Sequence, residues 1–140
     1  MTHYTSYDLI EWAKPFEKRK NALPKPKGSE VLIRVTAAGL CHSDLHVQKG
    51  YMDLGNEGRL TFAERGAELP MTFGHEIAGV VENTGADVNS FKKGQQVLVF
   101  PWIGCGECAA CKEERESDCA SMRIIGLKQK GGFATHCLVE

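Results

Sequence analysis

The sequence lacks an excess of charge of either sign, a long apolar run and a leader-like start. Its 17 Lys and Arg residues nearly cancel its 18 Asp and Glu residues, so no overall field attracts nucleic acid or an anionic membrane. Aliphatic runs such as Val97–Phe100 are far too short to span a bilayer. The Met1–Trp12 start has neither the basic nor the apolar region of a signal peptide. We therefore expect a cytoplasmic protein with no nucleic-acid partner and no membrane contact.

The chain of 140 residues is long enough for one domain with a buried core. Its fifteen glycines and several short β-branched runs favour a mainly β domain. In the strand with the clearest alternation, Val31, Ile33 and Val35 should face the same side. We expect strands at Tyr4–Trp12, Val31–Ala38, Ile77–Glu82, Gln96–Phe100 and Phe133–Val139, an edge or hairpin strand at Lys14–Lys20, a short helix at Cys41–Lys49 and a polar loop at Tyr51–Leu69.

The most distinctive stretch is Gly104–Cys119, in which four cysteines form the pattern C-x2-C-x2-C-x7-C. These are Cys105, Cys108, Cys111 and Cys119. Thiolates this close in sequence converge on one point when the backbone folds into a loop, which suits a tetrahedral ion that prefers sulfur. Small residues between them let the backbone pass close to the ion. Four sulfur ligands leave no open coordination position, so the pattern predicts a structural zinc site.

Three other interpretations of the four cysteines remain open. An iron–sulfur cluster also takes four thiolates, and the first three cysteines share the ferredoxin spacing. The fourth does not, because seven residues precede Cys119 where ferredoxins have three, and Ala120 follows it where ferredoxins have proline. Disulfides are typical of secreted proteins, and nothing marks this chain as secreted. A loop of free thiols is the remaining alternative, and zinc is favoured over all three.

A second group of residues that could bind a metal or take part in catalysis lies in Gly39–His46 (GLCHSDLH) and Gly74–Glu76 (GHE). Each signal is weak alone, because a single cysteine after a strand is more often a small buried hydrophobe, and a lone histidine is more often structural. Cys41 and His75 are 34 positions apart, so their spacing cannot bring them together. Only the fold could form a site from them.

The order of these motifs is informative. Gly39–His46, then Gly74–Glu76, then the four-cysteine loop together resemble the zinc-dependent medium-chain alcohol dehydrogenases, and the resemblance covers nearly the whole chain. It implies that residues 1–140 are that family's N-terminal, GroES-like catalytic domain. The implied fold is a partly open β-barrel with short helices and a zinc-binding loop. In the family a Rossmann domain that binds NAD or NADP follows.

The resemblance also implies a catalytic zinc site. Cys41 and His75 would be zinc ligands, and Glu76 would be an alternate ligand beside them. Asp44 would accept a hydrogen bond from the His75 ring and so fix its tautomer. Zinc would then act as a Lewis acid on an alcohol substrate.

Three residues of the Cys41–His46 segment acquire further roles from the resemblance. Ser43 and His46 resemble the proton relay that carries the substrate's hydroxyl proton to solvent, a role that suits histidine because an imidazole can take up and release a proton under mild conditions. His42 resembles the residue that contacts the cofactor pyrophosphate. Without the family order, Ser43 would be interpreted as a helix N-cap and His46 as a solvated surface residue.

Two departures from the family pattern stand out. The interval from Cys41 to His75 is longer than in many members, and Tyr51–Leu69 resembles an insertion near the substrate cleft. The chain also reaches Glu140 without a G-x-G-x-x-G after a strand, so we expect the Rossmann domain and the third zinc ligand to be absent from it. Cys137 lies in a strand pattern and is better explained as a buried thiol than as a replacement ligand.

The sequence therefore predicts the catalytic domain of a zinc-dependent alcohol dehydrogenase. The complete enzyme would oxidise a small-molecule alcohol to an aldehyde or ketone with NAD or NADP as a homo-oligomer, and this chain would be inactive alone. The alternative is a non-enzymatic, zinc-stabilised GroES-like module for binding or oligomerisation.

Overall fold

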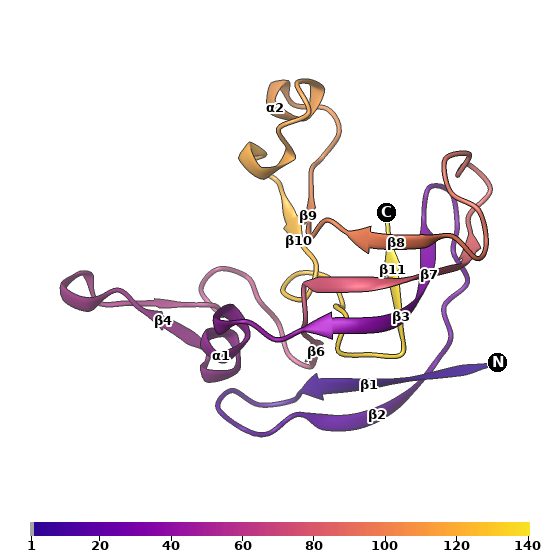
Figure 1. Ribbon diagram of the computed structural model, residues 1–140. Helices are drawn as coiled ribbons and strands as arrows, with labels where there is room; N and C mark the ends of the chain where they lie inside the picture. Colours follow the sequence, from indigo (N-terminus) through magenta and orange to yellow (C-terminus); the bar gives the residue numbers. More distant parts are fainter. Residues whose placement is uncertain (1) are drawn as a thin grey trace.

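Strands dominate the computed structural model, which describes residues 2–140 (Figure 1). They are β1 (His3–Leu9), β2 (Glu17–Ala22), β3 (Val31–Gly39), β4 (Tyr51–Asp53), β5 (Arg59–Thr61), β6 (Met71–Thr72), β7 (Glu76–Thr84), β8 (Gln96–Val99), β9 (Trp102–Ile103), β10 (Arg123–Ile124) and β11 (His136–Val139). The helices are α1 (His42–Lys49) and α2 (Ala109–Lys112), with 3-10 turns η1 (Gly55–Glu57) and η2 (Glu116–Asp118). No helix within residues 2–140 is long and apolar enough to cross a membrane.

Two antiparallel sheets form the body of the protein. The main sheet has the strand order β11-β3-β7-β8, and the N-terminal sheet has the order β2-β1-β6. Residues 133–135 join them. On one side the Tyr7 N–H donates to the Phe133 carbonyl at 2.8 Å, and on the other the Val35 N–H donates to the Thr135 carbonyl at 2.9 Å. The sheets do not close into a complete barrel, which confirms the predicted mainly β, partly open architecture.

Two apolar clusters fill the interior. The cluster on the main sheet consists of Val31, Ile33, Ile77, Val81, Ile125, Cys137 and Val139. The other gathers residues from β1, α1 and the segment after β5, namely Leu9, Val47, Phe62, Ala67 and Phe73. Burying an aliphatic side chain of this size stabilises the fold by about 1.5–3 kcal/mol. Val47 therefore anchors α1 to the body, and with it the residues at both ends of that helix.

Strand β3 shows the alternation expected of it. Val31 and Ile33 belong to the cluster on the main sheet and Val35 packs against it, whereas Leu32 is buried but belongs to neither apolar cluster. The pairing of β3 with β7 shifts between Leu32 and Ile33, and again between Val35 and Ala37. A bulge of this kind sets two residues of one strand against one of the other and bends the strand locally.

The predicted strands are found, but several differ at their ends. β1 stops at Leu9 rather than Trp12, because the chain turns there and Ala13 adopts a left-handed φ of 61°. The predicted hairpin partner forms as β2, slightly later in the chain than expected. β11 begins at His136 rather than Phe133, because the residues before it link the two sheets.

The interpretation of Tyr51–Leu69 as a polar loop is wrong in its first half. β4 and β5 form an antiparallel hairpin there, which projects from the body on the left of Figure 1. The Asp53 carboxylate accepts a hydrogen bond from the Gly55 N–H at 2.9 Å, and the Arg59 guanidinium carbon lies 4.3 Å from the centroid of the Tyr51 ring. Strands of three residues are too short to produce a readable alternation, which is why the pattern did not show them.

Candidate metal centres

The four-cysteine loop forms a separate lobe above the main sheet (Figure 1). β9 and β10 pair as a two-stranded ribbon, with Trp102 opposite Ile124, and so bring the two ends of the loop together. Between them the chain makes only α2 and η2. A loop with so little secondary structure buries little apolar surface. Its stability therefore depends on what its cysteine side chains bind.

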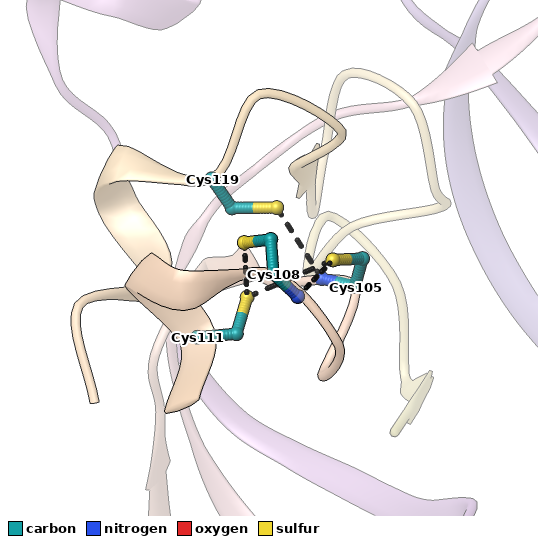
Figure 2. Close-up of side chains that lie close together, drawn as sticks. All are labelled: Cys105, Cys108, Cys111 and Cys119. Atoms are coloured by element: carbon teal, nitrogen blue, oxygen red, sulfur yellow. Dashed lines mark hydrogen bonds between the residues drawn. The ribbon is translucent and has the colours of Figure 1, made fainter. Parts of the chain in front are cut away.

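The four sulfur atoms of this lobe converge on one point, as Figure 2 shows. All four lie within 4.8 Å of one another, with 3.5 Å between the sulfurs of Cys108 and Cys111 and 3.9 Å between those of Cys105 and Cys111. Zinc–sulfur bonds of about 2.3 Å in a tetrahedron place sulfurs about 3.8 Å apart. The spacing of these atoms therefore fits a zinc ion.

Backbone groups favour negative charge on Cys105. Hydrogen bonds from the backbone of Glu107 and Cys108 lower the pKa of Cys105 to about 6, and the Cys108 N–H lies 3.4 Å from its sulfur. The pKa of Cys111 instead rises to about 12, because desolvation and the neighbouring thiols outweigh a lowering hydrogen bond from Gly106. Four sulfurs this close cannot all ionise without a cation between them. The donor set therefore suits a divalent metal ion.

Gly104 is needed for this packing. A Cβ atom at this position would lie 2.5 Å from the Cys111 sulfur and 2.9 Å from the Glu116 side chain. The absence of a side chain lets the backbone approach the cluster, as the sequence predicted for the small residues of the loop. On the lobe surface Arg115 contacts Glu113 and Asp118 at 2.7 and 2.6 Å, but such exposed pairs contribute at most about 1 kcal/mol.

The fold also brings together the two halves of the second predicted site. β3 and β7 run antiparallel with Gly39 opposite Glu76, so the residues after β3 and before β7 lie at the same end of the sheet. There the Cys41 sulfur lies 3.3 Å from Nε2 of His75. Tetrahedral zinc would hold a sulfur and a ring nitrogen about 3.6 Å apart. The pair therefore also fits a zinc ion.

Asp44 connects this pair to the start of α1. Its Oδ2 atom accepts a hydrogen bond from the Cys41 N–H at 3.0 Å, and its Oδ1 atom lies 3.7 Å from Nδ1 of His75. The second distance is longer than a hydrogen bond, although the contact is the one the resemblance implied. Asp44 is 3% exposed, so water does not screen this contact. The helix N-cap is Cys41, so the N-cap interpretation of Ser43 is wrong.

Glu76 stands apart from this group. The cluster of ligand atoms within 4.8 Å of one another comprises Cys41, Asp44 and His75 and does not include Glu76. Its side chain is exposed and packs over Gly39, where an added Cβ atom would lie 2.2 Å from Glu76 Oε2. A rotation of the Glu76 side chain is required before its carboxylate can join the other ligands.

The remaining predicted residues lie on α1. Ser43 is the second residue of the helix and is exposed. The rings of His42 and His46 stack on one side of the helix, with their centroids 4.6 Å apart and 27° between their planes. His42 is exposed and His46 is half-buried. Ser43 and His46 therefore both lie on the helix whose N-cap is Cys41.

Cys137 is a buried thiol, as the sequence suggested. It is 3% exposed, its sulfur lies 3.5 Å from the Lys130 carbonyl oxygen, and burial raises its pKa to about 12.

The capping of the Cys41 backbone N–H by the Asp44 side chain was not predicted from the sequence. A signal for it was present, because Cys41-x-x-Asp44 matches the capping-box pattern with cysteine in the first position.

An open β-barrel with a four-thiolate lobe and a Cys–His pair at the end of two central strands defines a zinc-binding domain of the GroES-like class. The chain belongs to the alcohol dehydrogenase GroES-like domain family, whose model matches residues 27–140. This match confirms the resemblance that the order of the motifs indicated.

Characterised relatives agree with this assignment. An NAD-dependent alcohol dehydrogenase from Sulfurisphaera tokodaii is 43% identical over 132 residues, which are 94% of this chain and 37% of that protein. The D-arabinose dehydrogenase structure from Sulfolobus solfataricus superimposes with a TM-score of 0.80 and 32% identity over 99% of this chain and 38% of its own. The structure of a cobalt- and zinc-bound alcohol dehydrogenase from Pyrobaculum aerophilum gives a TM-score of 0.80 and 26% sequence identity. That match covers 98% of this chain and 39% of the other. The chain therefore spans little more than a third of these proteins.

Proposed function

We propose that this chain supplies the metal-binding catalytic domain of a zinc-dependent alcohol dehydrogenase, which oxidises an alcohol to an aldehyde or ketone with NAD or NADP. The observation that carries the proposal is the 3.3 Å contact between the Cys41 sulfur and the His75 ring, with the buried Asp44 carboxylate behind it. A soft ligand, an imidazole and a carboxylate that orients it are the components of a catalytic zinc site. The domain family and the activities for which its relatives are named support the same conclusion.

The residues around this pair have distinct proposed roles. Cys41 and His75 hold the ion, and Glu76 reaches it only after its side chain rotates. Asp44 orients the His75 ring and fixes the Cys41 backbone. When bound, zinc supplies Lewis acidity toward the substrate oxygen.

The α1 residues handle the proton and the cofactor in this proposal. The Ser43 hydroxyl takes up the substrate's proton and His46 passes it to solvent, since an imidazole exchanges protons readily near neutral pH. His42, which is exposed and whose ring stacks on that of His46, contacts the cofactor pyrophosphate. The four-cysteine lobe holds a second zinc ion with a structural role, because four thiolates leave no open position.

The substrate is a small alcohol or its carbonyl product. The relatives act on different members of this class, since one is named an alcohol dehydrogenase and another a D-arabinose dehydrogenase. The β4–β5 hairpin, which projects close to the end of α1, is the segment we propose to influence substrate access. Six free cysteines fit a reducing compartment, which supports a cytoplasmic location.

An apolar groove supports association of the protein. The groove has a volume of about 630 Å³ and opens beside β8, the edge strand of the main sheet. Its rim exposes Phe91, Leu98, Phe100 and Trp102, and Leu98 is 85% exposed. Exposed apolar surface of this kind usually marks an interface. We propose that this groove takes part in oligomerisation. The alternative function, a non-enzymatic binding or oligomerisation module, would use the same groove.

Metal stoichiometry tests the proposed function. Protein equilibrated with excess zinc should hold two thiolate-bound ions per chain, and cobalt substitution should give cobalt–thiolate absorption at both. Cys41→Ser should remove one ion and Cys108→Ser the other. If the parent protein binds only one ion, and Cys41→Ser still binds that ion, the catalytic site is contradicted and the non-enzymatic module is favoured.

A further inference from the structure

Two histidines on α1 form a ligand pair outside both thiolate sites. His42 and His46 are four residues apart, so they lie one turn from each other on the same face of the helix. Their ring centroids are 4.6 Å apart. Two imidazoles at this spacing on a helix are an established way for proteins to hold a divalent transition metal ion, as in the H-x-x-x-H part of zinc protease motifs.

The ring nitrogens of this pair are free to bind. Within residues 2–140, neither ring makes a side-chain hydrogen bond or an ion pair, in contrast to His3, His75 and His136. The nearest carboxylate in sequence, Asp44, is buried and directed to Cys41 and His75. His42 is exposed and His46 half-buried, so an ion can reach both from solvent.

The helix offers only two nitrogen donors to the ion, so an ion bound there would keep open positions for water.

We propose that His42 and His46 together bind one divalent transition-metal ion such as Zn²⁺. This site is distinct from the four-cysteine lobe and from the Cys41–His75 pair. Imidazole donors suit zinc, and two of them bind it more weakly than thiolate clusters do. The site therefore fills only when zinc exceeds the amount that the thiolate sites take up.

A functional consequence follows, and this part rests on the proposed function. The same two rings are the proposed relay and the proposed pyrophosphate contact. An ion bound to both would occupy the nitrogens that those roles need. Excess zinc would then inhibit the enzyme whose catalysis depends on zinc.

Binding can be tested without turnover. The protein is first saturated with zinc at its thiolate sites, freed of excess metal, and titrated with further Zn²⁺ by calorimetry at one fixed pH. Ring ¹H–¹⁵N spectra of the five histidines are recorded alongside. We expect one additional, weaker ion per chain, with shifts concentrated on His42 and His46 and none on the buried His136.

Matched variants separate this site from other zinc contacts. His42→Gln and His46→Gln should each weaken the additional site by at least about tenfold, because the second ligand of a chelate acts at high effective concentration. His3→Gln removes another exposed histidine and should leave the affinity unchanged. His3 and His42 are exposed and His46 is half-buried, so none of the three changes removes a core side chain and the folded spectrum should persist.

Three results would overturn the proposal: no additional ion, equal affinity in parent and both α1 variants, or shifts confined to His75. The last would mean that the metal enters the Cys41–His75 group and that the stacked rings are a packing contact only. Because the thiolate sites are counted separately, failure here leaves the test of the proposed function intact.

Discussion

The Oδ1 atom of Asp44 lies 3.7 Å from Nδ1 of His75, while the other oxygen of the same carboxylate accepts the Cys41 N–H. One buried side chain thus contacts both members of the Cys41–His75 pair. In the proposed zinc site this contact gives Asp44 a positioning role, and its effect on the metal can be measured separately from its effect on folding.

Asp44→Asn should weaken zinc at the Cys41–His75 site by about 10–100-fold, the usual cost of losing a carboxylate behind a ligating histidine. The amide keeps the size of the side chain and one acceptor for the Cys41 N–H, so helix α1 should persist. Competition with a chelator measures the affinity. Asp53→Asn, an exposed change in the β4–β5 hairpin, is the control and should leave the affinity unaltered.

Cys108→Ser should abolish zinc binding in the lobe and lower the free energy of unfolding by several kcal/mol, because metal binding contributes directly to the folding of such a loop. Zinc content and the midpoint of thermal unfolding are the measurements. Cys41→Ser should spare the lobe zinc and most of the stability. Brown protein containing iron would show instead that the lobe holds a cluster.

Zinc at the Cys41–His75 site should exchange faster than zinc in the lobe, since the described residues place two ligands there and Glu76 must rotate to join them. Glu76→Gln should weaken this site further and leave the lobe unchanged. Residues 1–140 alone should produce no NAD(P)H from alcohol and NAD(P). Turnover by this chain, or equal affinity at both sites in Glu76→Gln, would contradict these expectations.

Cys137 should resist alkylation in the folded protein between pH 7 and 9. Burial raises the pKa of its thiol from 9.0 to about 12, so the reactive thiolate is scarce. The stability linked to this group is fully present below pH 9, and it is lost as the pH rises from 9 toward 12, where only the unfolded chain ionises readily. Mass spectrometry after iodoacetamide treatment checks the first point, and denaturant midpoints across this pH range check the second.

Leu98→Glu should reduce self-association, because it places a charge on the exposed rim of the apolar groove. Light scattering at high protein concentration is the measurement. Leu54→Glu, at the exposed tip of the β4–β5 hairpin, should leave the association state unchanged. A parent protein that is a monodisperse monomer at high concentration would argue against the groove as an interface.

Local patterns predicted those parts of the molecule that depend on local chemistry. The cysteine spacing indicated the lobe, because four ligands between Cys105 and Cys119 can meet only if the chain forms a loop. Strand β3 was found from its β-branched run, but its bulges were not, since they depend on how β7 pairs with it. The Cys41–His75 contact required the family resemblance, because no property of either segment specifies a partner 34 positions away.

The pairing of Gly39 with Glu76 has a consequence for how the chain selects its native strand alignment. If β7 slipped by two residues along β3, every side chain would keep its face. The same slip would carry His75 about 6.6 Å away from Cys41, since a strand advances about 3.3 Å per residue. Zinc can bridge the two in one alignment and not in the other. An ion held by both residues would therefore stabilise the native alignment of β3 and β7 relative to the slipped one.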